Sequence, residues 1–166
     1  MIKAVVNLTA AFVSIGILTA CAGLVRTDPA VLSAPITHIY SFEDMESSEI
    51  YRMSRLWVSD TFISADDVIN FDDPESFALR GRAIARTPVQ GDMFNRQFFY
   101  NFSIDVDGSR ARLQFNNFRE STYYSGSVRV VGIDGSLQNQ YDAIERHLNG
   151  VAASYENYIR TPEEAW

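Results

Sequence analysis

The stretch that decides the fold is FFYNFSIDVDGSRARLQF, residues 98–115. In residues 98–106 every even-numbered side chain is apolar, and the side chains between them are mostly polar. Residues 110–115 alternate in the same way. Such alternation is typical of antiparallel strands with one buried face and one solvated face. Because Asp107-Gly108 between the two runs is a strong hairpin signal, we expect two antiparallel strands joined by a tight turn.

The same alternation is present on the N-terminal side of this stretch. Residues 77–85 place apolar or small side chains at the odd positions, while Arg80 and Arg82 point the other way. A third antiparallel strand is therefore expected. Further strands are expected at residues 36–42, which are rich in β-forming residues, at residues 66–71 before a turn at 72–74, and at residues 128–133 after a loop at 123–126.

Two segments have the spacing of amphipathic helices. Apolar residues recur every three or four positions from Ile50 onward and predict a helix that ends near Phe62. Ser47 and Ser48 lie at its start as N-cap candidates, among acidic residues that suit a first helical turn. Residues 137–159 carry an apolar stripe with steps of three and four residues, which predicts a long second helix.

Together these elements predict an α+β fold. Both helices are able to cover the apolar face of one antiparallel sheet, which makes a two-layer sandwich of five to six strands with two helices on one face. Asn149-Gly150 lies in the middle of the long helix and indicates a kink or a close contact there. We expect a single domain at residues 36–160, followed by a tail at residues 161–166.

The overall composition excludes several classes of protein. A length of 166 residues suits one domain, and a formal net charge of −7 argues against a nucleic-acid binder. The single cysteine excludes an internal disulfide and any site that needs several cysteine ligands.

Residues 1–20 have the layout of a secretory signal peptide, with a positive start followed by a mainly apolar run. The run ends in Leu18–Cys21 (LTAC), which resembles a bacterial lipobox. The resemblance implies cleavage before Cys21 and lipid attachment to this cysteine. Residues 21–35 are expected to be a tether, because they contain Gly23, Pro29 and Pro35 and have no sustained period. An uncleaved transmembrane helix is the alternative, disfavoured because the run contains Asn, Thr, Ser and Gly. Ala22 in place of an aspartate favours the outer membrane, with the domain facing the periplasm.

The solvated face of the predicted sheet carries the candidate binding residues. Arg80 and Arg82 come from one strand, and Arg110 and Arg112 come from another. Because guanidinium groups match carboxylates and phosphates, this face is a candidate site for an anionic ligand or partner protein. The alternative is that these arginines only form cross-strand ion pairs with Asp105 and Asp107.

Other chemistry-bearing residues give weaker signals. His38 and His147 lack neighbours at metal-ligand spacing. The acidic residues at 66, 67, 72, 73 and 75 resemble a calcium site in composition but lack the spacing of a calcium-binding loop, so acidic turns around a strand are favoured. No nucleophile motif is present, and we predict no catalytic residue, cofactor or metal. Trp166, after two glutamates, is either a packed end or a partner contact.

This combination of elements resembles a domain family of unknown function that occurs mainly in bacterial lipoproteins and has a TATA-binding-protein-like fold. The resemblance covers about residues 36–120 and implies no catalytic residue. It is carried by Ile39–Phe42, Glu49–Met53, Leu56–Val58, Asp67–Ile69, Leu79–Ala83, the aromatic strand at 98–106, and Asp107–Arg112.

We therefore expect a lipid-anchored lipoprotein of the bacterial cell envelope with a non-catalytic binding or assembly domain. Its partners would be the membrane, through the lipid on Cys21, and an envelope protein or anionic ligand, but not nucleic acid. A hydrolase acting on cell-wall or lipid material is the rival hypothesis, and it requires two carboxylates in a pocket or an acid beside His38. A purely structural role in the envelope is the third.

Overall fold

The computed structural model describes residues 28, 34–62, 68–86, 97–124, 127–132 and 138–161. The predicted signal peptide, Cys21, most of the tether and the tail from residue 162, including Trp166, lie outside these residues. Among the described residues, no helix has the length and apolar character needed to cross a bilayer. The elements are β1 (Ile36–Ser41), α2 (Ser47–Thr61), β2 (Ile69–Asp73), β3 (Ala78–Arg86), β4 (Gln97–Asp107), β5 (Arg110–Tyr124), β6 (Ser127–Gly132) and α4 (Gln138–Arg160).

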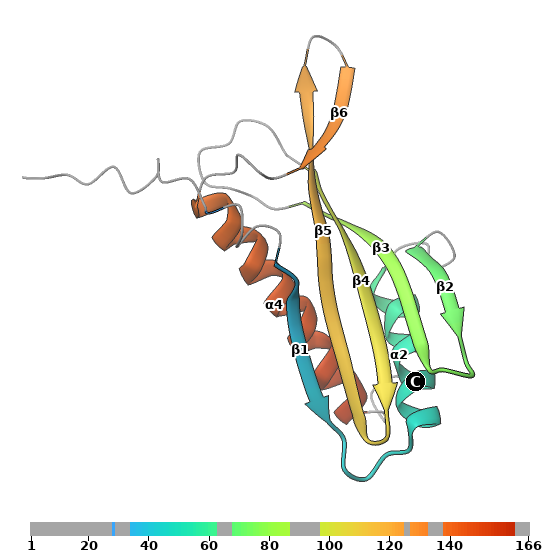
Figure 1. Cartoon of the computed structure of the whole chain (residues 1–166). Helices are drawn as coiled ribbons and strands as arrows, with labels where there is room; N and C mark the ends of the chain where they lie inside the picture. The colour runs from blue at the N-terminus through green and yellow to red at the C-terminus, as the bar shows by residue number, and fades with distance from the viewer. Residues whose placement is uncertain are drawn as a thin grey trace, which may run out of the picture.

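The strands form one antiparallel sheet in the order β1-β5-β4-β3-β2, and β6 pairs with the far end of β5. Helices α2 and α4 lie side by side behind this sheet, so that one face is covered and the other is open (Figure 1). We call the uncovered side the open face. The predicted two-layer α+β sandwich is confirmed.

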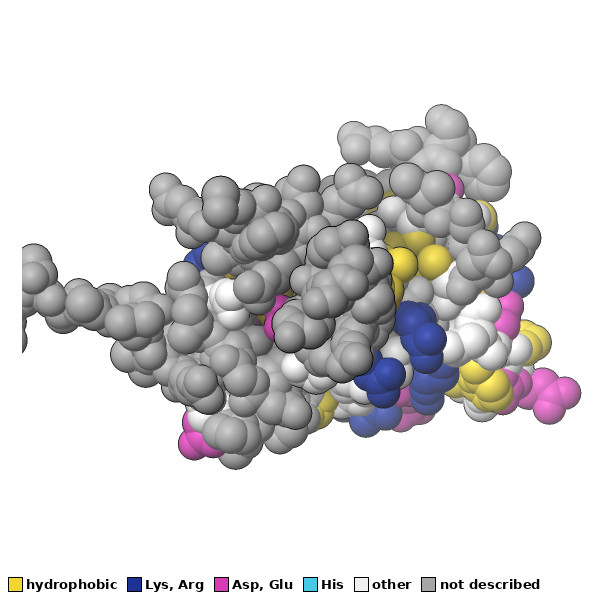
Figure 2. Space-filling model, turned by 90° about the horizontal axis from the view of Figure 1, so that it is seen from above, with side chains coloured by type: hydrophobic (Ala, Val, Ile, Leu, Met, Phe, Trp, Pro, Cys, Tyr) yellow, Lys and Arg dark blue, Asp and Glu magenta, His cyan; other side chains and the backbone are white. Residues whose placement is uncertain are grey.

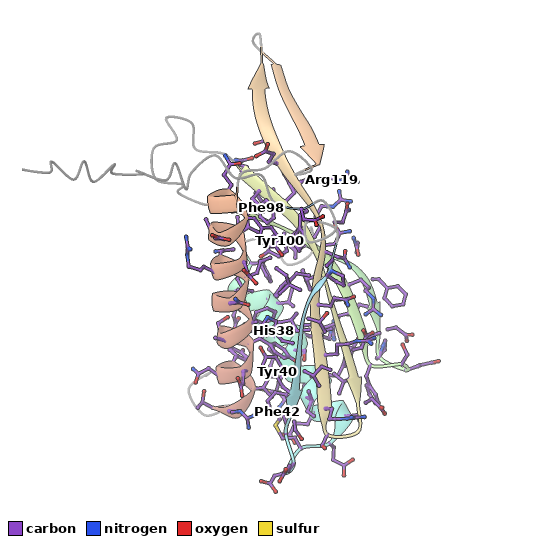
Figure 3. All side chains as sticks on the ribbon, turned by 60° about the vertical axis from the view of Figure 1, so that its left-hand side comes forward. His38, Tyr40, Phe42, Phe98, Tyr100 and Arg119 are labelled. Atoms are coloured by element: carbon purple, nitrogen blue, oxygen red, sulfur yellow. The ribbon has the colours of Figure 1, made fainter. Side chains whose placement is uncertain are left out.

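The core lies between the sheet and the two helices, and aromatic side chains dominate it. Figure 3 shows the labelled side chains of β1 and β4 on the side of the sheet that α4 covers. Tyr40 donates a hydrogen bond to the Ala152 carbonyl of α4 at 2.9 Å, and Ser54 of α2 bonds Tyr155 of α4 at 2.8 Å. The largest fully buried side chains are Trp57, Tyr100, Tyr155, Phe102 and Phe115.

The central hairpin has the predicted form at its turn and a longer second strand than predicted. Asp107 pairs with Arg110, and Gly108 supplies the positive φ of 58° that the tight turn needs. However, β5 does not end at Phe115: it runs to Tyr124, and the predicted loop at 123–126 is partly strand. The sequence pattern does not predict this longer strand, because a β-bulge interrupts the alternation of apolar and polar residues.

The bulge lies at Asn117, which has a positive φ of 54°. An extra residue on β5 at this point reverses which side chains face the helices. Phe115 and Phe118 are consequently both buried, although they are three positions apart. Beyond the bulge Arg119 pairs with Phe99 and lies on the open face.

Strand β2 differs from its prediction because its two aspartates belong to the ladder. It covers Ile69–Asp73 instead of residues 66–71, of which 66 and 67 are not described, and the turn occupies residues 74–77. Asp72 accepts a hydrogen bond from the Tyr51 hydroxyl of α2. It also forms an ion pair with Arg55 of the same helix, with 2.8 Å between Oδ2 and Nε. These contacts hold the strand end against the helix layer.

Two local predictions about the helices, the N-cap of α2 and a close contact at Gly150, are corrected. The N-cap of α2 is Glu46 without a side-chain cap bond, and Ser47 instead donates to the Gly108 carbonyl at 2.8 Å. Helix α4 continues through Gly150, where an added Cβ would meet no atom within 4 Å, so no close contact explains this glycine. His147 is half-buried, with its ring at an edge-to-face angle to Tyr100.

Candidate binding face

The open face presents a polar centre that the strand register builds row by row. Arg80 lies opposite Ser103, which lies opposite Gln114, which in turn lies opposite Thr37 of β1. Gln114 donates to the Thr37 hydroxyl at 3.1 Å. A second row joins Arg82, Asn101 and Asn116. In both rows, amide and hydroxyl groups therefore lie beside the arginine of β3.

The structure brings the four predicted arginines onto this face and pairs three of them with acids. Arg80 and Arg112 share a single carboxylate, because both donate to Asp105, the latter at 3.0 Å. Arg110 lies 3.8 Å from Asp107, a side chain that is 94% exposed. The alternative of cross-strand pairing is thus confirmed for these three arginines, while no ion pair joins Arg82 to a described carboxylate.

Arg119 is a fifth arginine of the open face that sequence reasoning missed. Figure 3 shows it on the side of the sheet away from α4. Its Nε donates to the Asn117 side chain at 3.2 Å, and no described carboxylate pairs with it. An asparagine two positions before an arginine, at a break in the alternation, is the only signal in the sequence for this placement.

Charge on the open face is opposite in sign to that of the whole chain. Its described residues include five arginines against three aspartates, Asp73 among them, although the chain carries a net charge of −7. Asp73 accepts hydrogen bonds within its own turn from the Ser76 hydroxyl and the Glu75 amide, and these bonds lower its pKa. Figure 2 shows basic side chains gathered in one group, with apolar, neutral and some acidic side chains around it.

A hollow of about 310 Å³ lies over the middle strands of this face. Its lining is polar, and Asp105 is its only carboxylate among the described lining residues. Because both oxygens of Asp105 already accept from arginines, the hollow offers donors to a ligand more than acceptors. The lining includes Arg80, Asn101, Ser103, Arg112, Gln114 and Asn116.

Comparison with known proteins agrees with this architecture. Residues 37–121, just over half of the chain, match the family model described as a domain of unknown function (DUF4468) with TBP-like fold. The chain belongs to the DUF4468 family. The match spans β1 through most of β5, which are the strands that build the open face. It confirms the resemblance that the sequence predicted over residues 36–120.

Two solved structures share the fold of this DUF4468 chain. A TBP-like protein from Parabacteroides distasonis ATCC 8503 is 8% identical with a TM-score of 0.63, and the alignment covers 76% of this chain and 92% of that one. A DUF4468 family protein from Bacteroides ovatus ATCC 8483 is 12% identical with a TM-score of 0.51, covering 84% and 87%. No curated protein matches the chain.

The arrangements that a hydrolase would need are not found among the described residues of this DUF4468 domain. The hollow has one carboxylate instead of two. His38 stacks on Tyr40, and its Nε2 is buried without a hydrogen-bond partner, so no acid contacts this nitrogen. No described group of three or more His, Cys, Asp or Glu side chains is placed to hold a metal. Asp66 and Asp67 of the acidic cluster lie outside the described residues.

Proposed function

We propose that this DUF4468 protein is a non-catalytic binding module of the bacterial cell envelope whose open face binds an anionic partner. The observation that carries the proposal is the incomplete neutralisation of that face. Arg80 and Arg112 share one carboxylate, and Arg82 and Arg119 have no described acidic partner. Guanidinium groups with free donors on a solvated sheet are suited to carboxylates or phosphates.

The rest of the chain restricts which anions can approach. Outside the open face acidic residues outnumber basic ones, because the chain as a whole carries −7. A long polyanion such as nucleic acid would extend beyond the basic patch and meet like charge. The partner in this proposal is therefore a local cluster of negative charge and not a nucleic acid.

The binding proposal is tested with a short poly-L-glutamate, whose chain does not extend beyond the basic patch, as a probe of defined chemistry. The full chain, purified in a non-ionic detergent, is expected to bind the polymer at low ionic strength and to release it at high ionic strength, because exposed charge pairs are screened by salt. Absence of binding at low salt would refute the proposed anion-binding face.

A lipid anchor at Cys21 places this domain at a membrane in our proposal. Support comes from the signal-like segment and Leu18–Cys21, and several acyl chains on one residue are sufficient for stable anchoring. Metabolic labelling with a palmitate analogue should label the wild-type protein and not Cys21→Ser. Equal labelling of both would contradict the anchor, and fractionation of the labelled protein would report whether it resides in the outer membrane.

A further inference from the structure

The open face also carries exposed apolar side chains that binding a simple anion does not require. In the described residues the exposed large hydrophobic side chains are Ile39 (67% exposed), Phe71 (50%) and Ile84 (58%). Single exposed apolar residues are common on protein surfaces. These three all lie on the same face of the sheet, on β1, β2 and β3.

The register places each of these side chains close to an arginine. Ile39 lies directly opposite Arg112, and Phe71 lies directly opposite Arg80. Residues opposite one another on neighbouring antiparallel strands have Cβ atoms about 4.5–5.5 Å apart.

The third exposed side chain, Ile84, also lies near an arginine, but this arginine is on its own strand. Ile84 is two positions from Arg82 on the same face of β3, and it lies opposite Phe99, which pairs with Arg119. The face therefore repeats one unit, a guanidinium beside an exposed apolar side chain, at several places around the polar centre.

From this pairing we infer that the partner of the open face is an acidic protein segment that carries apolar side chains next to its carboxylates. This inference rests on the proposed function and names the class of the partner. Protein–protein interfaces are enriched in arginine and aromatic residues and bury apolar groups inside a polar rim. A sulfated or phosphorylated glycan would satisfy the arginines but leave Ile39, Phe71 and Ile84 in water. A protein segment satisfies both.

The test compares three short probes of similar length on the full chain in detergent: the same poly-L-glutamate, a random copolymer of glutamate and tyrosine, and a heparin fragment. Wild type is expected to bind the copolymer about tenfold more tightly than poly-L-glutamate, since burying apolar side chains adds to the charge interaction. The double variant Ile39→Ser/Ile84→Ser, which keeps only Phe71 of the three, should lose most of this preference and keep its affinity for poly-L-glutamate. Unchanged thermal unfolding and circular dichroism would show that the variant is folded.

Each other outcome overturns a distinct statement. If the serine variant keeps the preference for the copolymer, or if heparin binds as tightly as the copolymer, the inference of a protein partner is wrong while the anion-binding face stands. If none of the three probes binds wild type at low salt, the proposed function itself fails, and the inference with it.

Discussion

Arg112 of β5 lies directly opposite Asp105 of β4 and donates to its Oδ2 at 3.0 Å, while Arg80 of β3 donates to Oδ1 of the same carboxylate. One acid thus lies between two guanidinium groups from different strands. It holds both side chains in place over the sheet, and it also neutralises part of the charge that would attract a partner.

Replacing Asp105 by Asn should therefore strengthen binding of an anion. The amide keeps the size of the side chain but removes its charge, so the positive charges of Arg80 and Arg112 are no longer neutralised, although Arg80 keeps its bonds to the Leu79 and Ile104 carbonyls. We expect poly-L-glutamate to bind Asp105→Asn about three- to fivefold more tightly, and we expect the free energy of unfolding to fall by about 1–2 kcal/mol, because a carboxylate that is only 26% exposed loses two ion pairs of up to about 1 kcal/mol each. Titration calorimetry and urea unfolding measure the two effects. Weaker binding would mean that Asp105 helps to form the site.

Gly81→Ala should destabilise the fold. Gly81 is at a buried position of β3, and an added Cβ would overlap the Phe102 ring and lie 2.7 Å from the Val68 carbonyl oxygen. Overpacking of this kind costs about 1–3 kcal/mol. Urea unfolding of the full chain measures the loss, with Gly150→Ala as the matched control, because a Cβ there meets no atom within 4 Å. Equal stability of the two variants would contradict the tight packing at Gly81.

Asn117→Val should also destabilise the protein, for a backbone reason. Asn117 has a φ of 54°, a region that asparagine tolerates and that β-branched residues avoid. We expect the free energy of unfolding, measured with urea, to fall by about 1–2 kcal/mol for valine and to change little for glycine. A valine variant as stable as the glycine variant would show that the bulge is not held in this conformation.

Stability should decrease with falling pH, partly because of His147. Burial lowers the pKa of His147 below its ordinary value of 6.5. As pH falls through 6.5 the unfolded chain takes up this proton before the folded protein does, so the unfolded state is favoured. The free energy of unfolding should therefore fall between neutral and mildly acidic pH, and less so in His147→Gln. The same slope in both proteins would exclude a contribution from His147.

How far the sequence alone predicts this molecule depends on whether the relevant signal is periodic. The alternation over residues 98–115 is sufficient for the central hairpin, since one buried face imposes a period of two. The stripe of α4 is equally clear, and Tyr141, Leu148 and Ile159 are buried as expected. The bulge at Asn117 has no such signal, because one inserted residue breaks the alternation, and in the sequence this break looks like the end of a strand.

The candidate site is predictable in its residues and less so in its interactions. Alternation is sufficient to place Arg80 and Arg112 on one face, but only the register shows that they share Asp105. Arg119 is placed by the bulge, and the grouping of Ile39 with Arg112 depends on which strands are neighbours. Strand order is a long-range property, and no local pattern in the chain encodes it.

The most direct measurement is the affinity of the full chain for poly-L-glutamate in three proteins: wild type, Arg82→Gln/Arg112→Gln, and the charge-matched control Arg52→Gln/Arg146→Gln. Arg52 of α2 and Arg146 of α4 are exposed residues of the helix layer, so their loss also removes two charges but leaves the open face intact. If the open face binds anions, the open-face variant should bind about three- to tenfold more weakly than wild type, and the control should bind almost as well as wild type. Equal weakening by both changes would mean that binding follows net charge alone, which contradicts a binding site on this face.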